Sequence, residues 1–286
     1  MADQHRPTRP ARPSAALGAQ GRGTPARGAR PVEPRPAATV MLVREGGDPP
    51  DLEVYLLRRV SSMPFAPGAY VFPGGSVDPR DADAEIAWSG PPAGEWARRL
   101  GADEPLARAL VCAAVRETFE ESGVLLAGSS SHEVVADTRG DDWEEDRRAL
   151  IDRTLSFADF LRRRRLVLRS DLLRPWAQWI TPEAEPRRYD TRFFAALLPE
   201  GQQTRDVGGE ADRVAWVRPR AAVEGWRRGE LAMLPPTVIT LGELAECATV
   251  SEVLAAERVI SPIMPELREV DGEVRVLLPD GVDQPE

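Results

Sequence analysis

The sequence has 286 residues, of which 42% are hydrophobic and 29% are charged, so it can form one large domain or two small ones. The formal net charge of -9 argues against binding of a polyanion by bulk electrostatics, and we expect no nucleic acid partner. All 37 basic residues are arginine, which excludes Schiff-base chemistry and any phosphate-binding loop that needs a lysine.

Composition divides the chain into a tail, a domain and an extension. Residues 1–37 are rich in proline, alanine, glycine and arginine, which predicts a disordered basic tail. Residues 38–248 are expected to form the main domain. Its segment at about 76–103 is polar and broken by proline and glycine, which predicts a long surface insertion. Residues 249–286 are expected to pack on the domain as a C-terminal extension.

Strand and helix patterns mix along the domain without strict alternation. The strand patterns occur at 38–43, 52–59, 69–75, 176–181, 191–199, 213–219 and 273–279. The helical patterns occur at 103–122, 141–165, 220–228, 235–248 and 250–258. This mixture predicts an α/β fold of the α+β type, an α/β sandwich or α+β layer fold, rather than a doubly wound parallel sheet.

The helix expected at 103–122 ends in a cluster of like charge. Glu117, Glu120 and Glu121 share one arc because they are spaced i, i+3 and i+4. Such pairs repel by roughly 0.2–0.5 kcal/mol each, and anions are unfavourable near a helix C-terminus. Arg116 offsets this in part, and Gly123 is placed to end the helix. The cluster fits either a solvated helix end or a site for Mg²⁺ or Mn²⁺, which prefer oxygen ligands.

Cysteine, histidine and hydropathy exclude several other classes of site. Cys112 and Cys247 lie far apart and outside metal or redox spacing, which is typical of a reduced, cytoplasmic protein. His5 and His132 fall in the tail and in a polar loop, which argues against zinc sites and Ser-His-Asp triads. No apolar stretch approaches the roughly 20 residues of a bilayer span, so we expect no membrane partner.

The stretch "RETFEESGV" (116–124) resembles the core of the Nudix box, and "FPGG" (72–75) resembles its start, with Gly75 at the matching place. A long insertion separates the two parts. The early glutamate of the box has no clean match: Asp81 holds its offset from Gly75, while counting back from Arg116 gives Arg108. An interrupted box, "LLRRVSSMPFAPGAYVFPGG" (56–75) and "WITPEAEPRRYDTRFFAA" (179–196) resemble the subgroup of the peroxisomal coenzyme A diphosphatases.

This resemblance implies a Nudix-like α/β/α sandwich with a mixed sheet and extra helices. It implies metal-dependent hydrolysis of a small-molecule nucleoside diphosphate derivative, with coenzyme A or acyl-coenzyme A as the expected substrate. A broader pyrophosphatase acting on NADH or ADP-ribose, a catalytically silent ligand-binding module and an RNA-cap enzyme are the alternatives. The complete glutamate cluster favours an enzyme. A homodimer is left open.

The resemblance also implies roles for individual residues. Glu117, Glu120, Glu121 and the backbone carbonyl of Gly75 would hold Mg²⁺ or Mn²⁺, and Arg116 would orient a glutamate. Arginines suit phosphate oxygens, and the candidate substrate-binding residues are Arg58, Arg59, Arg187, Arg188 and Arg192. The general base would be a cluster glutamate or a later carboxylate, namely Glu183, Glu185 or Glu210. Phe72 and Tyr189 are expected in the core, with stacking on a base as the alternative.

Overall fold

The computed structural model describes residues 30–47, 50–63, 66–83, 85–205, 211–270, 273–279, 281–282 and 285. Residues 1–29 of the predicted tail therefore lie outside the described residues. Residues 30–34 carry no regular structure, and the first strand begins at Arg35, three positions before residue 38, where the domain was predicted to begin.

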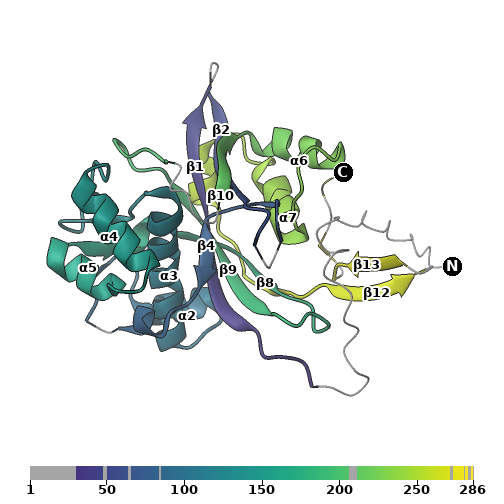
Figure 1. Ribbon diagram of the computed structural model, residues 1–286, viewed down its shortest axis with the longest axis horizontal. Helices are drawn as coiled ribbons and strands as arrows, with labels where there is room; N and C mark the ends of the chain where they lie inside the picture. Colours follow the sequence, from purple (N-terminus) through teal and green to yellow (C-terminus); the bar gives the residue numbers. More distant parts are fainter. Residues whose placement is uncertain are drawn as a thin grey trace.

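A mixed sheet forms the centre of the molecule (Figure 1). Its main path runs in the order β10-β2-β1-β9-β8-β11, with β3 paired to β2 and β4 paired to β1. The strands are β1 (Arg35–Gly46), β2 (Asp51–Arg59), β3 (Tyr70–Val71), β4 (Gly74–Ser76), β8 (Arg174–Ile180), β9 (Tyr189–Leu197), β10 (Ala211–Val217) and β11 (Pro262–Ile263). The pairs β1–β9 and β8–β11 are parallel and the others antiparallel, which confirms the predicted mixed sheet.

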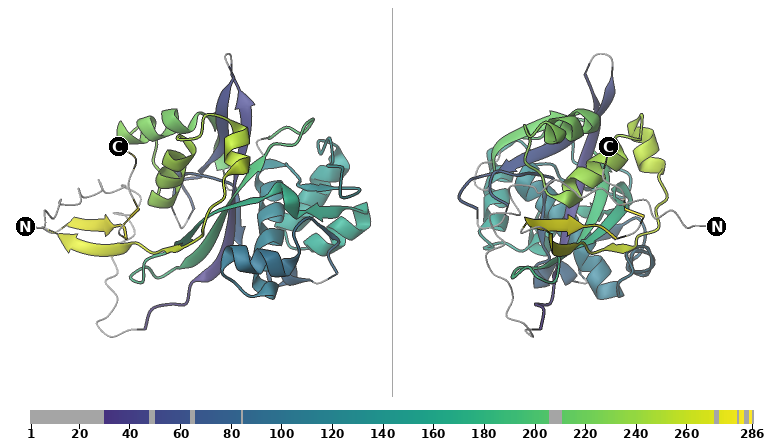
Figure 2. Two further views of the ribbon diagram at one scale, coloured as in Figure 1. Left: turned by 180° about the vertical axis from the view of Figure 1, so that it is seen from behind. Right: turned by 90° about the vertical axis from the view of Figure 1, so that its right-hand side faces the viewer.

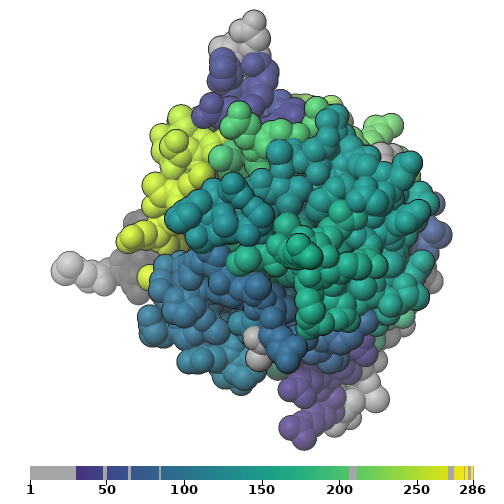
Figure 3. Space-filling view, turned by 90° about the vertical axis from the view of Figure 1, so that its left-hand side faces the viewer, coloured from purple at the N-terminus to yellow at the C-terminus, as the bar shows by residue number. Residues whose placement is uncertain are grey.

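Helices cover both faces of this sheet, giving the three layers expected from the sequence (Figures 1 and 2). One face is covered by α2 (Ala93–Leu100), α3 (Glu104–Ser122), α4 (Asp141–Ile151) and α5 (Phe157–Arg164). The other is covered by α6 (Pro219–Arg227), α7 (Pro235–Leu244) and α8 (Val250–Ala255). Figure 3 looks onto the first face, which is closed over by the segment coloured from blue to teal. No described helix is both long and apolar enough to cross a membrane.

Each face of the sheet has its own apolar core, because side chains alternate along the strands. Val40 and Leu42 of β1 point to the α3 face and pack with Val111 and Phe119 of that helix. Met41 of the same strand points to the opposite core, which contains the apolar side chains of α7 and α8. Helix α3 is buried along almost its whole length, as its apolar sequence predicts.

The insertion at about 76–103 is more ordered than its polar composition suggests. It contains a short 3-10 helix (Pro79–Ala82), the strand β5 (Trp88–Ser89) and helix α2. Trp96 and Leu100 lie one turn apart on α2 and are completely buried against the core of the α3 face. The prediction of a purely surface excursion is therefore wrong, because two large apolar side chains at i, i+4 suffice to dock a short amphipathic helix.

Two smaller sheets complete the fold. Strand β5 joins β6 (Ala127–Gly128) and β7 (Val167–Arg169) in the order β5-β7-β6, beside α2–α5. Near the C-terminus, β12 (Glu266–Val270) and β13 (Glu273–Leu277) form an antiparallel hairpin. In Figure 1 this hairpin lies on the side of the sheet occupied by α7, beyond β8.

Candidate active site

Helix α3 carries the glutamate cluster at its C-terminal end, and we call residues 117–122 the acidic turn. The local sequence fixes both ends of the helix. Asp103 precedes the helix, and its carboxylate accepts the backbone N–H of Leu106 at 2.9 Å. Gly123 follows the helix with a φ of 75°, a left-handed conformation that glycine adopts without strain. The last turn is thereby held in one position, packed against strand β4.

The three glutamates of this turn have different partners. Nη1 of Arg116 lies 2.7 Å from Oε1 of Glu117 and 3.2 Å from Oε1 of Glu120. Glu121 is directed to strand β4, where its Oε2 accepts the backbone N–H of Gly74 at 2.7 Å. In the part of the chain that the structure describes, no three acidic, histidine or cysteine side chains converge into a metal-binding group. The carboxylates are held by Arg116 and Gly74 rather than turned toward a common point.

Arg116 is itself fixed by a buried carboxylate from the insertion. Asp81 is 1% exposed and receives two hydrogen bonds from the guanidinium group, from Nε at 3.0 Å and from Nη2 at 2.9 Å. The same Nη2 also donates to the backbone carbonyl of Ser76 at 3.0 Å. Asp81 therefore occupies the offset at which the Nudix box has its early glutamate, and it orients the arginine that contacts two of the cluster glutamates.

The glycines of "FPGG" are needed because the chain passes very close to its neighbours. A Cβ atom on Gly75 would lie 2.5 Å from the carboxylate carbon of Glu117. A Cβ atom on Gly74 would lie 2.5 Å from Oγ1 of Thr39 and 2.6 Å from the carbonyl oxygen of Ala38. Since real Cβ atoms do not approach so closely, a side chain on Gly74 would push β4 away from β1, and one on Gly75 would displace the carboxylate of Glu117.

Burial makes the charge of the acidic turn costly. Loss of solvent raises the pKa of Glu117 and of Glu120, while the nearby guanidinium group of Arg116 opposes this rise. Repulsion from the carboxylate of Glu120 also raises the pKa of Glu117. One arginine thus faces several carboxylates in a poorly solvated place, and a further positive charge would be stabilised there.

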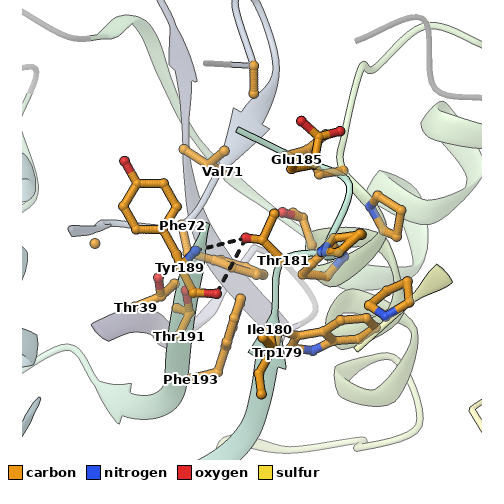
Figure 4. Close-up of a pocket in the computed structure, with 18 of the residues that line it drawn as sticks. Thr39, Val71, Phe72, Trp179, Ile180, Thr181, Glu185, Tyr189, Thr191 and Phe193 are labelled. Atoms are coloured by element: carbon orange, nitrogen blue, oxygen red, sulfur yellow. Dashed lines mark hydrogen bonds between the residues drawn. The ribbon is translucent and has the colours of Figure 1, made fainter. Parts of the chain in front are cut away.

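An apolar pocket lies on the opposite face of the sheet, close to the same glycines. Its floor is formed by side chains of three neighbouring strands and the turn after β3, including Phe72, Trp179 and Phe193 (Figure 4). The rings of Phe72 and Phe193 meet edge to face, with centroids 6.4 Å apart. The start of α7, residues 234–237, forms another wall. Such a mostly apolar cavity with few polar groups is typical of a small-molecule site.

Few polar side chains reach this pocket. Glu185 is 9% exposed, lines the pocket and lies toward the top of the view in Figure 4. Burial raises the pKa of Glu185. Thr181 accepts a hydrogen bond from the backbone N–H of Tyr189 at 3.0 Å, which holds the connection between β8 and β9 against the cavity. Arg59 also lines the pocket.

Gly74 connects the pocket to the acidic turn. It lines the cavity, and its backbone N–H binds the carboxylate of Glu121. Gly75, the next residue, packs against the carboxylate of Glu117. One dipeptide thus has the apolar pocket on one side and the acidic cluster on the other.

The arginines predicted to bind substrate have different surroundings. Arg58 forms a bidentate ion pair with Asp212 at the surface, whereas its neighbour Arg59 lines the pocket. Arg188 is buried and donates to the backbone carbonyls of Thr181 and Val32. Arg192 is buried as well, and it donates to the carbonyl of Leu100 and pairs with Asp190. Arg187 is exposed. Among these arginines, Arg59 is the one that the structure places at the pocket.

The remaining predicted residues also differ in position. Phe72 and Tyr189 both line the pocket, although Phe72 is almost fully buried. Of the three later carboxylates, Glu185 lines the pocket, Glu183 is exposed, and Glu210 lies outside the described residues.

Sequence reasoning did not recognise the pocket, and it left the role of Asp81 undecided. The offset of Asp81 from Gly75 was the signal that could have assigned it. The pocket has no comparable local signal, because its walls come from segments between Thr39 and Val276.

Comparison with known proteins agrees with the motif. A family model described as "NUDT19 Nudix domain" matches residues 95–244. Among curated proteins, the acyl-coenzyme A diphosphatase NUDT19 of Xenopus laevis is 26% identical over 239 residues, covering 71% of this chain and 62% of that protein. The human protein of the same name is 29% identical over 243 residues, covering 71% and 64%. The chain therefore spans less than two thirds of the length of these relatives.

Solved structures include a similar fold. A NUDIX hydrolase from Alicyclobacillus acidocaldarius superposes with a TM-score of 0.69 at 29% sequence identity. The superposition covers 80% of this chain and 98% of that one.

Proposed function

The chain belongs to the Nudix hydrolase family, and we propose that it cleaves the diphosphate bond of a nucleoside diphosphate linked to another group. Within this class we propose coenzyme A or an acyl-coenzyme A as the substrate. Relatives named acyl-coenzyme A diphosphatase align over 71% of the chain, which supports this choice. The apolar character of the pocket supports it as well, because an acyl group needs an apolar environment.

The observation that carries the proposal is the position of the Gly74–Gly75 dipeptide. Gly74 belongs to the pocket and to the hydrogen bond with Glu121, and Gly75 touches the carboxylate of Glu117. A substrate whose apolar group enters the pocket would therefore have its charged part beside the acidic turn. Binding and hydrolysis would then use one continuous surface.

The acidic turn fits a divalent cation in its chemistry. Its donors are carboxylate oxygens, its net charge is negative and poorly solvated, and β4 approaches closely enough to bring the backbone of Gly75 against the carboxylate of Glu117. We propose that Glu117, Glu120, Glu121 and the backbone carbonyl of Gly75 hold Mg²⁺ or Mn²⁺, which requires the glutamate side chains to turn from their present partners. When bound, the cation supplies charge neutralisation at the phosphates and lowers the pKa of water.

The protein residues have separate tasks in this proposal. Arg116, held by Asp81, positions Glu117 and Glu120. Arg59 is proposed to contact a phosphate, because it lies at the pocket and a guanidinium group matches phosphate oxygens. The aromatic floor excludes water from the apolar part of the substrate.

Two kinds of carboxylate are proposed for the general base. A glutamate of the acidic turn is one, and Glu185 is the other, because its raised pKa brings it closer to the working range of a base. The variant Glu185→Gln distinguishes them: a loss of kcat assigns the base to Glu185, and an unchanged kcat assigns it to the turn.

The aromatic pocket also supports a second candidate function. Phe72, Tyr189 and Phe193 present ring surfaces on which a nucleotide base can stack as well as an acyl chain can pack. A broader pyrophosphatase acting on NADH or ADP-ribose follows from this alternative.

A substrate panel tests these proposals. The purified chain is incubated with Mg²⁺ or Mn²⁺ and with coenzyme A, octanoyl-coenzyme A, NADH or ADP-ribose, and the products are identified by mass spectrometry. We expect both coenzyme A compounds to give two products, each with one phosphate of the original diphosphate. Faster turnover of NADH or ADP-ribose would favour the broader enzyme, and turnover of none would favour a binding module.

A further inference from the structure

The chain that follows the residues matched by the family model lines part of the pocket. The match ends at residue 244, whereas β11, β12 and β13 lie between 262 and 277. Strand β11 extends the main sheet by pairing with β8, with Pro262 opposite Gln178 and Ile263 opposite Trp179. Trp179 is itself part of the pocket, so this pairing brings the following residues to the rim of the cavity.

The hairpin β12–β13 turns one apolar pair toward the pocket. Leu267 and Val276 are opposite each other in the register, so their side chains share a face of the hairpin. Both line the cavity together with Pro265, and Val276 is 7% exposed. The next pair, Arg268 and Arg275, has the opposite orientation, as the alternation of a strand requires.

Contacts from the rest of the domain hold this segment in place. Nη2 of Arg188 lies 3.4 Å from Sδ of Met264, and the same guanidinium group donates to the carbonyl of Thr181 at 3.0 Å. Thr181 belongs to the pocket. Arg188 therefore links the connection between β8 and β9 to the chain just before the hairpin, so that two walls of the cavity are fixed together.

From this arrangement we propose that the C-terminal segment 262–277 is a specificity wall for the apolar group of the substrate, an inference that rests on the proposed function. Pro265, Leu267 and Val276 offer an acyl chain apolar contacts and offer no hydrogen bond to a polar group. The pocket therefore selects derivatives with an apolar chain over those without one, and the hairpin sets the space available to that chain.

Two valines of β13 provide a matched test. Val276 lines the pocket, whereas Val274 lies two positions earlier on the same strand and is 46% exposed. In Val276→Trp the added ring fills the space next to Leu267, and kcat/KM for octanoyl-coenzyme A falls by about tenfold or more. For free coenzyme A, which has no acyl chain to meet the added ring, kcat/KM falls much less. Val274→Trp leaves both values at the wild-type level. Leu267→Ala, which creates space, shifts the preference toward longer acyl chains.

Thermal unfolding and binding complete the experiment. The unfolding midpoint of each variant is measured first, and if Val276→Trp does not fold, Leu267→Ala alone decides. Binding of octanoyl-coenzyme A is followed by calorimetry without added metal, so that the result does not depend on turnover. Weaker binding to Val276→Trp than to Val274→Trp supports the specificity wall even if no substrate is hydrolysed, an outcome that would refute the proposed function. The specificity wall is overturned if Val276→Trp and Val274→Trp weaken binding of octanoyl-coenzyme A equally. It is also overturned if Val276→Trp changes kcat/KM equally for free and acylated coenzyme A.

Discussion

The two faces of the central sheet contribute different properties to the candidate active site. The α3 face supplies charge: two glutamates and a buried aspartate contact one arginine, and the third glutamate binds the backbone of strand β4. The α7 face supplies an apolar cavity with aromatic side chains and few polar ones. The glycines of β4 lie between them, and they contact both.

The two sides also differ in how the sequence builds them. The charged side comes from one helix and the insertion just before it, and hydrogen bonds from Arg116 to Asp81 and to the backbone of Ser76 join the two. The pocket collects side chains from the first strand to the last hairpin. If the charged side carries out the hydrolysis and the pocket binds the substrate, substitutions on the charged side should lower kcat. Substitutions in the pocket should raise KM.

The largest effect is expected from Glu121→Gln on the charged side. The amide oxygen can still accept the N–H of Gly74, so the fold is retained, but the charge available to a cation is lost. We expect kcat to fall on the order of 100-fold or more at saturating Mg²⁺, with KM little changed. Steady-state kinetics and thermal unfolding measure both effects. A wild-type kcat in this variant would refute the role of Glu121 in metal binding.

Asp81→Asn should have the next largest effect, because it removes the most deeply buried of the three carboxylates that pair with the guanidinium group of Arg116. Breaking such a pair costs about 3–5 kcal/mol of unfolding free energy. Since Arg116 contacts Glu117 and Glu120, kcat should also fall by about 10- to 100-fold. Urea unfolding and kinetics give the two quantities.

The matched control for Asp81 is Asp83→Asn in the same segment. Asp83 is half-buried, has no ion pair with Arg116 and accepts a backbone N–H from Glu85 at 2.8 Å. It should change neither stability nor kcat. Equal results for the two variants would show that Arg116 does not need Asp81.

The charged side could be predicted from sequence because its parts are close in the chain. The i, i+3, i+4 spacing places Glu117, Glu120 and Glu121 on one arc of any helix, and Gly123 marks where that helix ends. A layered α/β fold was indicated by the mixture of strand and helix patterns, and its three layers with a mixed sheet were implied by the resemblance to the Nudix family. The metal and the individual roles of these residues stay predictions.

The pocket could not be predicted, because its formation depends on tertiary packing. Nothing local to Leu267 or Val276 shows that their hairpin docks beside Trp179; strand β12 itself was not expected from the sequence. The positions of neighbouring arginines relative to the pocket could not be predicted either. Arg58 and Arg59 have the same sequence context, yet successive strand residues point to opposite faces, so that the pocket receives Arg59.

This pair of arginines gives a moderate test of the recognition side. Arg59→Ala should raise KM by about tenfold, since a charge-assisted hydrogen bond contributes about 1.5–3 kcal/mol, and kcat should change little. Arg58→Ala removes an exposed ion pair with Asp212 and should leave both constants unchanged. A loss of kcat rather than of binding in Arg59→Ala would contradict the separation of the two sides.

The smallest effect is expected from Glu144→Gln, which weakens the support behind the acidic turn. Arg147 is buried, donates to the backbone carbonyl of Glu120 at 2.7 Å and pairs with Glu144. The hydrogen bond from Arg147 lowers the pKa of Glu144 to about 2. Because this pKa is below the unfolded value of about 4.3, the ion pair stabilises the fold above that value, and the contribution disappears as the pH falls through 2.

Urea unfolding at several pH values measures this contribution. The difference in unfolding free energy between the wild type and Glu144→Gln should be constant near neutral pH and should shrink between about 4.3 and 2. The exposed neighbour provides the control, since Glu145→Gln should show no such dependence. A difference that grows toward low pH would have the wrong sign for a depressed carboxylate pKa. In that case Glu144 does not stabilise the charged side through Arg147, and the acidic turn depends on Asp81 and Gly74 instead.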